Sequence, residues 1–397
     1  MRATLQGNTL RNRWVILAII FCVRLAMPFQ FQSVAAVAPL LTDKFGLNLA
    51  DIGLLIGLYF APGIALGLPG GAIGQKFGDK ATVLGALALM AVGSLAMAFG
   101  DAWHWQIAGR LVAGAGGVLL NVQLTKMVTD WFAGKEIATA MGAFVNSWPA
   151  GIALSLVTLP SIGTAYGVKA VSLVVLALIV LGSLLALTYQ TPAQARPAGA
   201  SSARLSLNTA IALSVAGLIW GLFNAAFAIV FSFGPTMLVE RGWTIAQAGS
   251  AISIVLWIAV FSVPLGGVLA DRFKRPQTML VAGSIVFAAL MLAFAHTSAV
   301  IAILIVLGVV SGQPAGPIMS LPSRVLEPAT RALGMGLFYT IYYVPMVVGP
   351  VIAGSAAKWS GSASAAFDFG AVMLVICPPL LWVFNRISAP AAHPRLA

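Results

Sequence analysis

Long apolar runs separated by short polar segments make up almost the whole chain. A helix needs about 20 predominantly apolar residues to cross a bilayer, so runs of that length are candidate spans. The pattern predicts twelve membrane-spanning helices, at residues 14–41, 51–74, 81–100, 103–128, 137–159, 168–189, 208–236, 245–270, 277–296, 298–323, 332–356 and 364–385. Twelve helices of about 25 residues use about 300 residues, which leaves only short connections and no extramembrane domain.

The longest polar gap runs from Gln190 to Leu207 and is rich in Ala, Pro, Ser and Arg. That composition is typical of a flexible linker, and the gap follows the sixth predicted span. We therefore expect three parts. They are an N-terminal six-helix bundle at 1–189, a cytoplasmic linker at 190–207 and a C-terminal six-helix bundle at 208–397.

Two short motifs recur with nearly the same offset. Residues 71–80 (GAIGQKFGDK) follow span two, and residues 267–275 (GVLADRFKR) follow span eight, 196 positions later. Residues 140–142 (AMG) and 334–336 (GMG) are 194 positions apart. Each pair lies at the same place in a six-helix unit. The chain is therefore predicted to contain two parallel repeats related by an axis along the membrane normal.

Composition and charge support a membrane protein. The chain is 60% hydrophobic and 8% charged, whereas soluble domains carry about 25% charged residues, which argues against a soluble enzyme. Of the 22 Lys and Arg, sixteen fall on one side of the predicted spans, four on the other and two inside them. This asymmetry places both termini in the cytoplasm. It also explains the net charge of +12 without a nucleic-acid partner.

The two arginines inside the spans are Arg24 and Arg110, and no acid or histidine accompanies them. All ten acids and three histidines lie near helix ends or in loops. A charge within the membrane costs about 2.5–3.5 kcal/mol and faces the protein interior or a water-filled cavity. Arg24 lies roughly 15 Å of helix from the start of span one. Its guanidinium fork suits a ligand anion such as a carboxylate; satisfaction by helix carbonyls or water is the alternative.

Two more polar residues lie on the spans that carry these arginines. Arg110 in span four is followed at helical spacing by Asn121. Arg110 is predicted either to be a structural post, which joins helices through hydrogen bonds, or to form part of the anion path. Gln32 lies eight residues after Arg24 and on a neighbouring face of span one. Gln32 is predicted to line a cavity, with an interhelical hydrogen bond as the alternative.

Polar and aromatic residues also gather near the middle of other spans. We predict that seven of them line the same cavity, with an aromatic belt or proline-kinked packing as the alternatives. They come from span five, span seven, the proline-rich part of span ten and span eleven: Asn146, Trp148, Asn224, Gln313, Tyr339, Tyr342 and Tyr343.

The loop motif Gly-x-x-x-Asp-Arg-x-x-Arg at 267–275 resembles the signature of the major facilitator superfamily, and residues 110–116 resemble its Arg-x-x-x-Gly-x-Gly element. The resemblance implies that superfamily's twelve-helix fold and a conformational latch in these loops. In the first copy Gln75 replaces the acid, and in the second Lys274 replaces a glycine. The acid's role therefore carries over only to Asp271. The implied latch residues are Lys76, Asp271, Arg272 and Arg275.

Within that superfamily, Arg24 and the stretch 110–121 are similar to bacterial small-anion carriers of the cyanate and nitrate type. We therefore expect an all-α transporter in a bacterial-type inner (plasma) membrane. It would move a small anion, either a carboxylate or an inorganic anion such as cyanate or nitrate, by alternating access, with Arg24 as the binding cation. Efflux of lipophilic drugs is the alternative function.

An enzyme is not expected, because the spans contain no paired acids, nucleophile and base, or metal-ligand set. Cys22 and Cys377 lack metal-ligand spacing and are interpreted as small apolar residues. We expect no cofactor and no metal. The expected partners are a small anionic solute and the lipid bilayer, with no nucleic acid, and the chain is expected to be a monomer.

Overall fold

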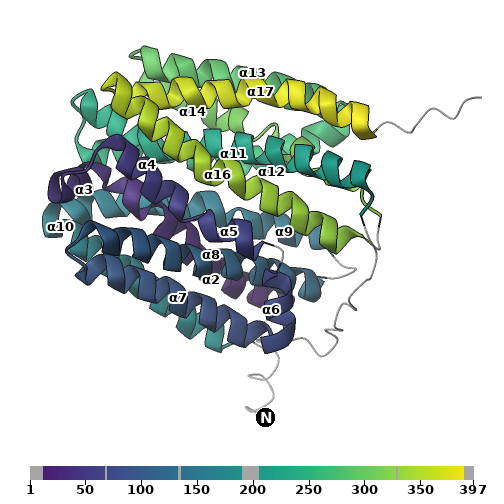
Figure 1. Ribbon diagram of the computed structural model, residues 1–397, viewed down its shortest axis with the longest axis horizontal. Coiled ribbons are helices and arrows are strands. Elements are labelled where there is room, and N and C mark those ends of the chain that lie inside the picture. Colours follow the sequence, from purple (N-terminus) through teal and green to yellow (C-terminus); the bar gives the residue numbers. More distant parts are fainter. Residues whose placement is uncertain (1–11, 68, 133–135, 190–204, 328–329, 389–397) are drawn as a thin grey trace, which may run out of the picture.

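The computed structural model describes residues 12–67, 69–132, 136–189, 205–327 and 330–388. These residues are almost entirely helical, and the long helices run side by side (Figure 1). The helices before residue 190, here called the N-half, are α2 (Arg13–Ala36), α3 (Ala38–Phe45), α4 (Leu49–Leu58), α5 (Ala61–Leu66), α6 (Gly70–Phe77), α7 (Asp79–Phe99), α8 (Trp103–Phe132), α9 (Ile137–Val145) and α10 (Ser147–Leu187).

The helices after residue 205 are called the C-half and follow the predicted spans closely. They are α11 (Leu207–Glu240), α12 (Ile245–Phe273), α13 (Pro276–His296), α14 (Val300–Ser311), α15 (Ala315–Met319), the short 3-10 helix η1 (Pro322–Arg324), α16 (Arg331–Ser360) and α17 (Ser364–Ser388). Most of the linker predicted at 190–207 lies outside the described residues.

Eleven helical segments of the described residues are long and apolar enough to cross a membrane. One of them, Thr139–Leu187, contains the predicted spans five and six. The chain turns between these two spans at Gly167, whose φ of 80° and ψ of 173° are outside the helical region. Glycine adopts a positive φ without a Cβ clash. The twelve predicted crossings are therefore present, although two of them share one continuous segment.

Several predicted spans are broken where prolines occur. Pro39 lies in the first turn of α3 and Pro62 in the first turn of α5. Proline has no N–H to donate and is best tolerated in the first turn of a helix, so a new helix starts at each position. Span ten is likewise divided into α14 and α15, with Pro314 as the residue that precedes α15.

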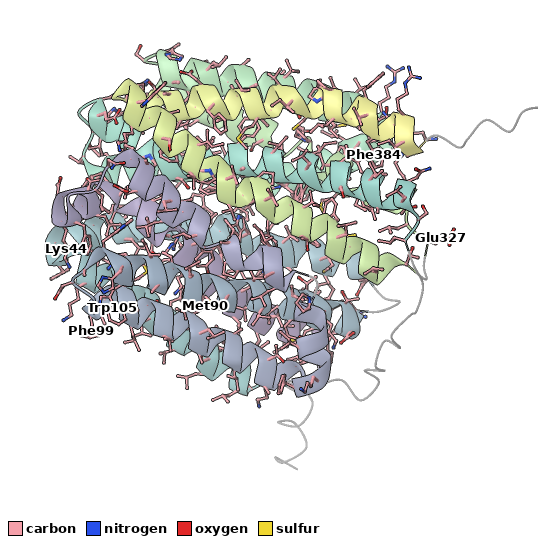
Figure 2. All side chains as sticks on the ribbon, in the orientation of Figure 1. Lys44, Met90, Phe99, Trp105, Glu327 and Phe384 are labelled. Carbon is pink, nitrogen blue, oxygen red and sulfur yellow. The ribbon has the colours of Figure 1, made fainter. Side chains whose placement is uncertain are left out.

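Each half packs mainly on itself. In the N-half, α2 packs against α10 and α7 against α8; in the C-half, α11 packs against α16 and α17. Side chains fill the spaces between these helices (Figure 2). The halves meet chiefly along α4 with α16 and α10 with α12, and purple and yellow-green ribbons lie next to each other there in Figure 1.

Backbone contacts close the halves against each other at one end. We call the end with Asn12 and Ser388 the chain-end face and the opposite end the far face. Near the far face, a Cβ on Gly53 would lie 2.2 Å from the Pro350 carbonyl oxygen, and one on Gly249 would lie 2.3 Å from that of Leu156. Only glycine allows such close approach of backbones. The seam between the halves is therefore tight at the far face.

Candidate functional site

A cavity of about 300 Å³ lies between the two halves. Its walls come from α2, α8, α9, α10, α11, α12, α14, α15 and α16, with Phe60 from the turn between α4 and α5. Eight of the eleven predicted binding residues line it: Arg24, Asn121, Asn146, Trp148, Asn224, Tyr339, Tyr342 and Tyr343. The structure thus brings together side chains that are more than 300 positions apart in the sequence.

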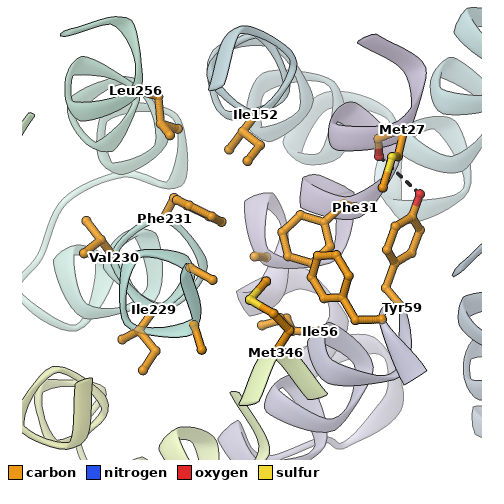
Figure 3. Close-up of a cluster of buried hydrophobic side chains, with 14 of the residues drawn as sticks. Met27, Phe31, Ile56, Tyr59, Ile152, Ile229, Val230, Phe231, Leu256 and Met346 are labelled. Atoms are coloured by element: carbon orange, nitrogen blue, oxygen red, sulfur yellow. Dashed lines mark hydrogen bonds between the residues drawn. The ribbon is translucent and has the colours of Figure 1, made fainter. Parts of the chain in front are cut away.

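The cavity is more accessible from the chain-end face. Val145 and Met319, which line it toward that face, are 45% and 36% exposed. On the far side, Phe31 and Phe231 are 1% and 2% exposed, and their rings meet across the seam with centroids 6.2 Å apart (Figure 3). The halves are therefore closed beyond the cavity at the far face.

Arg24 is the charged side chain among the described residues that line the cavity. Its Nε and Nη2 both donate to Oδ1 of Asn121, at 3.2 and 2.9 Å. Its Nη1 donates to the carbonyl oxygen of Phe144 at 2.9 Å and to Oγ of Ser147 at 3.0 Å. The Phe144 ring covers the guanidinium with its centroid 4.2 Å from Cζ. The charge is thus held in a fixed orientation.

These partners orient Arg24 without neutralising it. Each acceptor is an amide, a hydroxyl or a peptide carbonyl, and no described carboxylate pairs with Arg24. A guanidinium has five N–H donors, and the contacts above use the Nε hydrogen, both Nη1 hydrogens and one Nη2 hydrogen. One Nη2 hydrogen and the net positive charge are left for a ligand in the cavity.

The local sequence of span five explains why carbonyl oxygens face Arg24. Helix α9 ends at Val145 and α10 begins at Ser147. In a continuous helix the Val145 carbonyl would accept from the N–H of residue 149, but that residue is proline and has none. The Val145 carbonyl instead lies 3.4 Å from Nη1 of Arg24. Pro149 therefore helps to create the Arg24 site.

Arg110 has a different environment from the one expected for a binding residue. It is 0% exposed and is not among the residues that line the cavity. Its Nε, Nη1 and Nη2 donate to the carbonyl oxygens of Leu55, Gln30 and Phe31 at 2.9, 3.0 and 2.9 Å. Peptide oxygens of two neighbouring helices therefore satisfy Arg110. The structure supports the alternative of a structural post and not a place in the anion path.

Two predicted glutamines also lie outside the cavity lining. Gln32 is 0% exposed and donates from Nε2 to the Phe231 carbonyl oxygen at 2.6 Å, from α2 in the N-half to α11 in the C-half. Gln313 donates to the Val309 carbonyl oxygen in the preceding turn, at 3.2 Å. Gln32 thus makes the interhelical bond given as its alternative, and neither residue belongs to the proposed site.

Sequence reasoning found Trp148 and the three tyrosines of the aromatic lining but missed its phenylalanines. Six lining side chains form a continuous series, with successive ring centroids 5.0–6.3 Å apart: Trp148, Phe60, Tyr343, Tyr342, Trp220 and Phe223. We call these six residues the aromatic wall. Phenylalanine in an apolar span has the same hydropathy signal whether it faces lipid, core or cavity. No sequence pattern therefore distinguished Phe60 or Phe223.

The implied latch residues lie at the chain-end face. Lys76, Arg272 and Arg275 are exposed there, whereas the side chain of Asp271 lies outside the described residues. A buried acid appears nearby instead, because Asp79 at the start of α7 accepts hydrogen bonds from Lys126 at 2.9 Å and from Gln123 at 2.5 Å. The repeated motif thus places one paired charge at the chain-end face of the N-half.

In the part of the chain that the structure describes, no three His, Cys, Asp or Glu side chains gather where they could hold a metal ion. The cavity contains amides, phenols, indoles and one guanidinium. Such groups can bind a ligand through a charge-assisted hydrogen bond and stacking. They supply neither an evident nucleophile with its base nor a carboxylate acid–base pair.

Known proteins similar to this chain include membrane transporters. A hexuronate transporter of Bacillus subtilis is 22% identical over 279 residues, which is 66% of this chain and 65% of that transporter. A lysosomal dipeptide transporter of Danio rerio is 26% identical over 382 residues, 88% of this chain and 81% of that protein. The match to the hexuronate transporter thus spans slightly less than two thirds of its length.

Solved structures show the same fold. A bacterial homologue of the human lysosomal transporter Spinster, in an inward-facing and occupied conformation, superposes with a TM-score of 0.79 at 17% identity. The superposition covers 96% of this chain and 99% of that one. The model of the Major Facilitator Superfamily matches residues 20–244 and again residues 209–396. This double match accounts for nearly the whole sequence, and the chain therefore belongs to the Major Facilitator Superfamily.

Proposed function

We propose that this chain transports small organic anions that carry a carboxylate. The single observation that carries the proposal is Arg24, a cation held in the cavity by neutral groups only. An unpaired charge in a membrane protein is expensive, and a carboxylate matches the geometry of a guanidinium. A bound carboxylate would supply the missing negative charge.

The size and lining of the cavity favour an organic anion over cyanate or nitrate. A volume of about 300 Å³ lies at the lower end of the range for small-molecule sites and far exceeds that of a three- or four-atom ion. Much of the lining is aromatic or aliphatic, which suits a carbon skeleton attached to the carboxylate. Two relatives fit this choice, because hexuronates and dipeptides both carry a carboxylate.

The two faces of the molecule support transport by alternating access. The halves are in backbone contact near the far face, whereas the cavity is accessible from the chain-end face. The excess of Lys and Arg near the chain-end face supports a cytoplasmic position for that face in a bacterial-type plasma membrane. The structure would then be the inward-facing state, and rocking of the halves would expose Arg24 to the other side.

The proposed site is complete within one chain, which favours a monomeric transporter. None of the described lining residues is an acid or a histidine, so a proton relay through cavity side chains is not part of the proposal. Exchange of two anions or facilitated diffusion fits these residues. Efflux of lipophilic cations is disfavoured because Arg24 would repel them.

Counterflow in proteoliposomes tests the proposal. The purified protein is reconstituted and assayed with a panel of labelled carboxylates, cyanate, nitrate and a cationic dye. We expect counterflow of carboxylates, about 10- to 100-fold weaker for Arg24→Ala because a charge-assisted hydrogen bond is lost. Arg24→Lys should retain part of the activity, since it keeps the charge and loses the fork.

Arg386→Ala is the matched control, because Arg386 is exposed at the end of α17 and remote from the cavity lining. It should transport like the unmodified protein. Carboxylate counterflow that is the same in Arg24→Ala and the control would refute the role of Arg24. Counterflow of the cationic dye alone would favour the efflux alternative.

A further inference from the structure

The aromatic wall continues around the far side of the cavity. On that side Phe31 stacks on Trp148 with centroids 5.6 Å apart and meets Phe231 at 6.2 Å. Phe231 in turn meets Phe227 at 5.4 Å. Phe287 then lies 5.9 Å from Phe227 and 6.0 Å from Phe223. Rings from both halves therefore form a closed series of contacts, and seven of its ten members line the cavity.

We propose that the preferred substrates are aromatic monocarboxylates, with the carboxylate at Arg24 and the ring against the aromatic wall. This inference rests on the proposed function and narrows its substrate class. Arg24 belongs to α2 of the N-half, whereas Trp220 and Phe223 belong to α11 of the C-half. A ligand with a carboxylate at one end and a ring at the other would contact both halves.

The arrangement of the rings suits a flat ligand. Trp220 and Phe223 are nearly parallel, with an interplanar angle of 16°, and Trp220 and Tyr342 differ by 29°. Aromatic pairs with centroids 4.5–7 Å apart attract one another beyond simple burial of apolar area. An aromatic ring should therefore be favoured by about 3- to 10-fold over a saturated ring of similar size.

Polyhydroxylated acids are less well matched, because several polar groups of the cavity are already engaged. Oδ1 of Asn121 accepts from Arg24, and Nδ2 of Asn224 donates to the Trp220 carbonyl oxygen at 2.8 Å. Ser311 donates to the Gly308 carbonyl oxygen at 3.2 Å. A sugar acid would have to desolvate many hydroxyls for few remaining partners, and burying unpaired polar groups is unfavourable.

Binding to the purified full chain tests this proposal with three anions of similar charge. Radiolabelled benzoate is displaced by unlabelled benzoate, cyclohexanecarboxylate or glucuronate at neutral pH. We expect benzoate to bind about 3- to 10-fold more tightly than cyclohexanecarboxylate, and glucuronate to bind most weakly. Equal affinity for benzoate and cyclohexanecarboxylate would overturn the aromatic preference and leave the carboxylate proposal intact. Failure of radiolabelled benzoate to bind would overturn the aromatic proposal, and failure of radiolabelled glucuronate to bind as well would contradict both proposals.

Variants of the aromatic wall give a second, independent readout. Trp220→Ala should abolish the preference for benzoate over cyclohexanecarboxylate, whereas Trp220→Phe should keep most of it. Phe223→Leu removes a ring with a smaller loss of volume and serves if Trp220→Ala does not fold. Trp382→Ala is the matched control, since Trp382 is 60% exposed on α17. An unchanged preference in both Trp220→Ala and Phe223→Leu would overturn the proposal.

Discussion

Replacing Arg110 should destabilise the protein without removing a substrate contact. The side chain makes three hydrogen bonds, to carbonyl oxygens of Gln30 and Phe31 in α2 and of Leu55 in α4. Leu55 lies in the last turn of α4, where carbonyls lack helical partners; the N–H of Tyr59 bonds to Gly57 and not to Leu55. Arg110 therefore completes a helix end and ties α8 to α2 and α4.

The expected loss of unfolding free energy follows from the number of hydrogen bonds that Arg110 makes. Side-chain hydrogen bonds inside membrane proteins contribute about 0.6–1.7 kcal/mol each, so three of them contribute about 2–5 kcal/mol. Arg110→Leu should lower the free energy of unfolding by that amount. Arg110→Lys should lower it by about 1–3 kcal/mol, because one ammonium group cannot reach three carbonyls on two helices. Arg386→Ala, at an exposed position, should change it by less than about 0.5 kcal/mol.

Equilibrium unfolding in mixed micelles of SDS and a mild detergent measures these differences, with ligand binding measured on the folded fraction. Cys377 is buried and Cys22 is exposed, so in a Cys22→Ser background the reaction of Cys377 with a thiol probe reports loss of packing independently. Folded Arg110→Lys should bind benzoate with nearly unchanged affinity, because Arg110 does not line the cavity. A variant that keeps full stability but loses binding would show that Arg110 belongs to the anion path after all.

Two further predictions concern the closed far face. Gly249→Ala should favour the state open at the far face, because the new Cβ would clash with the Leu156 carbonyl oxygen. Gly85→Ala, which meets nothing within 4 Å, is its control, and labelling of an engineered cysteine in the seam by an impermeant thiol reagent reports the shift. Gln32→Ala removes the bond to Phe231 and should raise the same labelling rate severalfold; labelling at the unmodified rate would show that this bond does not hold the seam closed.

The two intramembrane arginines show which properties of a charged residue can be predicted from sequence and which cannot. Arg24 and Arg110 give the same signal, a charge within an apolar run. Their environments differ because Arg24 lies beside the break between α9 and α10 at the cavity, whereas Arg110 lies among the carbonyls of α2 and α4. Which oxygens surround a guanidinium depends on residues from other helices. Hydropathy along a single span does not contain that information.

The other predicted site residues also include some that line the cavity and some that do not. Polar residues within the spans pointed to Asn121, Asn146 and Asn224, because polar groups are costly in lipid and therefore face the interior. Gln32 and Gln313 carried the same signal, yet they bond to backbone oxygens outside the cavity lining. A polar residue in a span was thus not by itself a sign of a ligand contact.

The number and order of the crossings can be predicted from the sequence alone, because the bilayer requires long apolar helices whose backbone groups bond internally. The sequence also determines which spans carry charge. The closed face, the arginine that remains available to a ligand and the meeting of rings from distant segments at one cavity all depend on how the helices pack together. Those properties arise from packing between helices. The Val145 carbonyl that Pro149 leaves without a helical partner matters because Arg24 lies beside it. The small size of Gly249 matters because the Leu156 carbonyl oxygen approaches it.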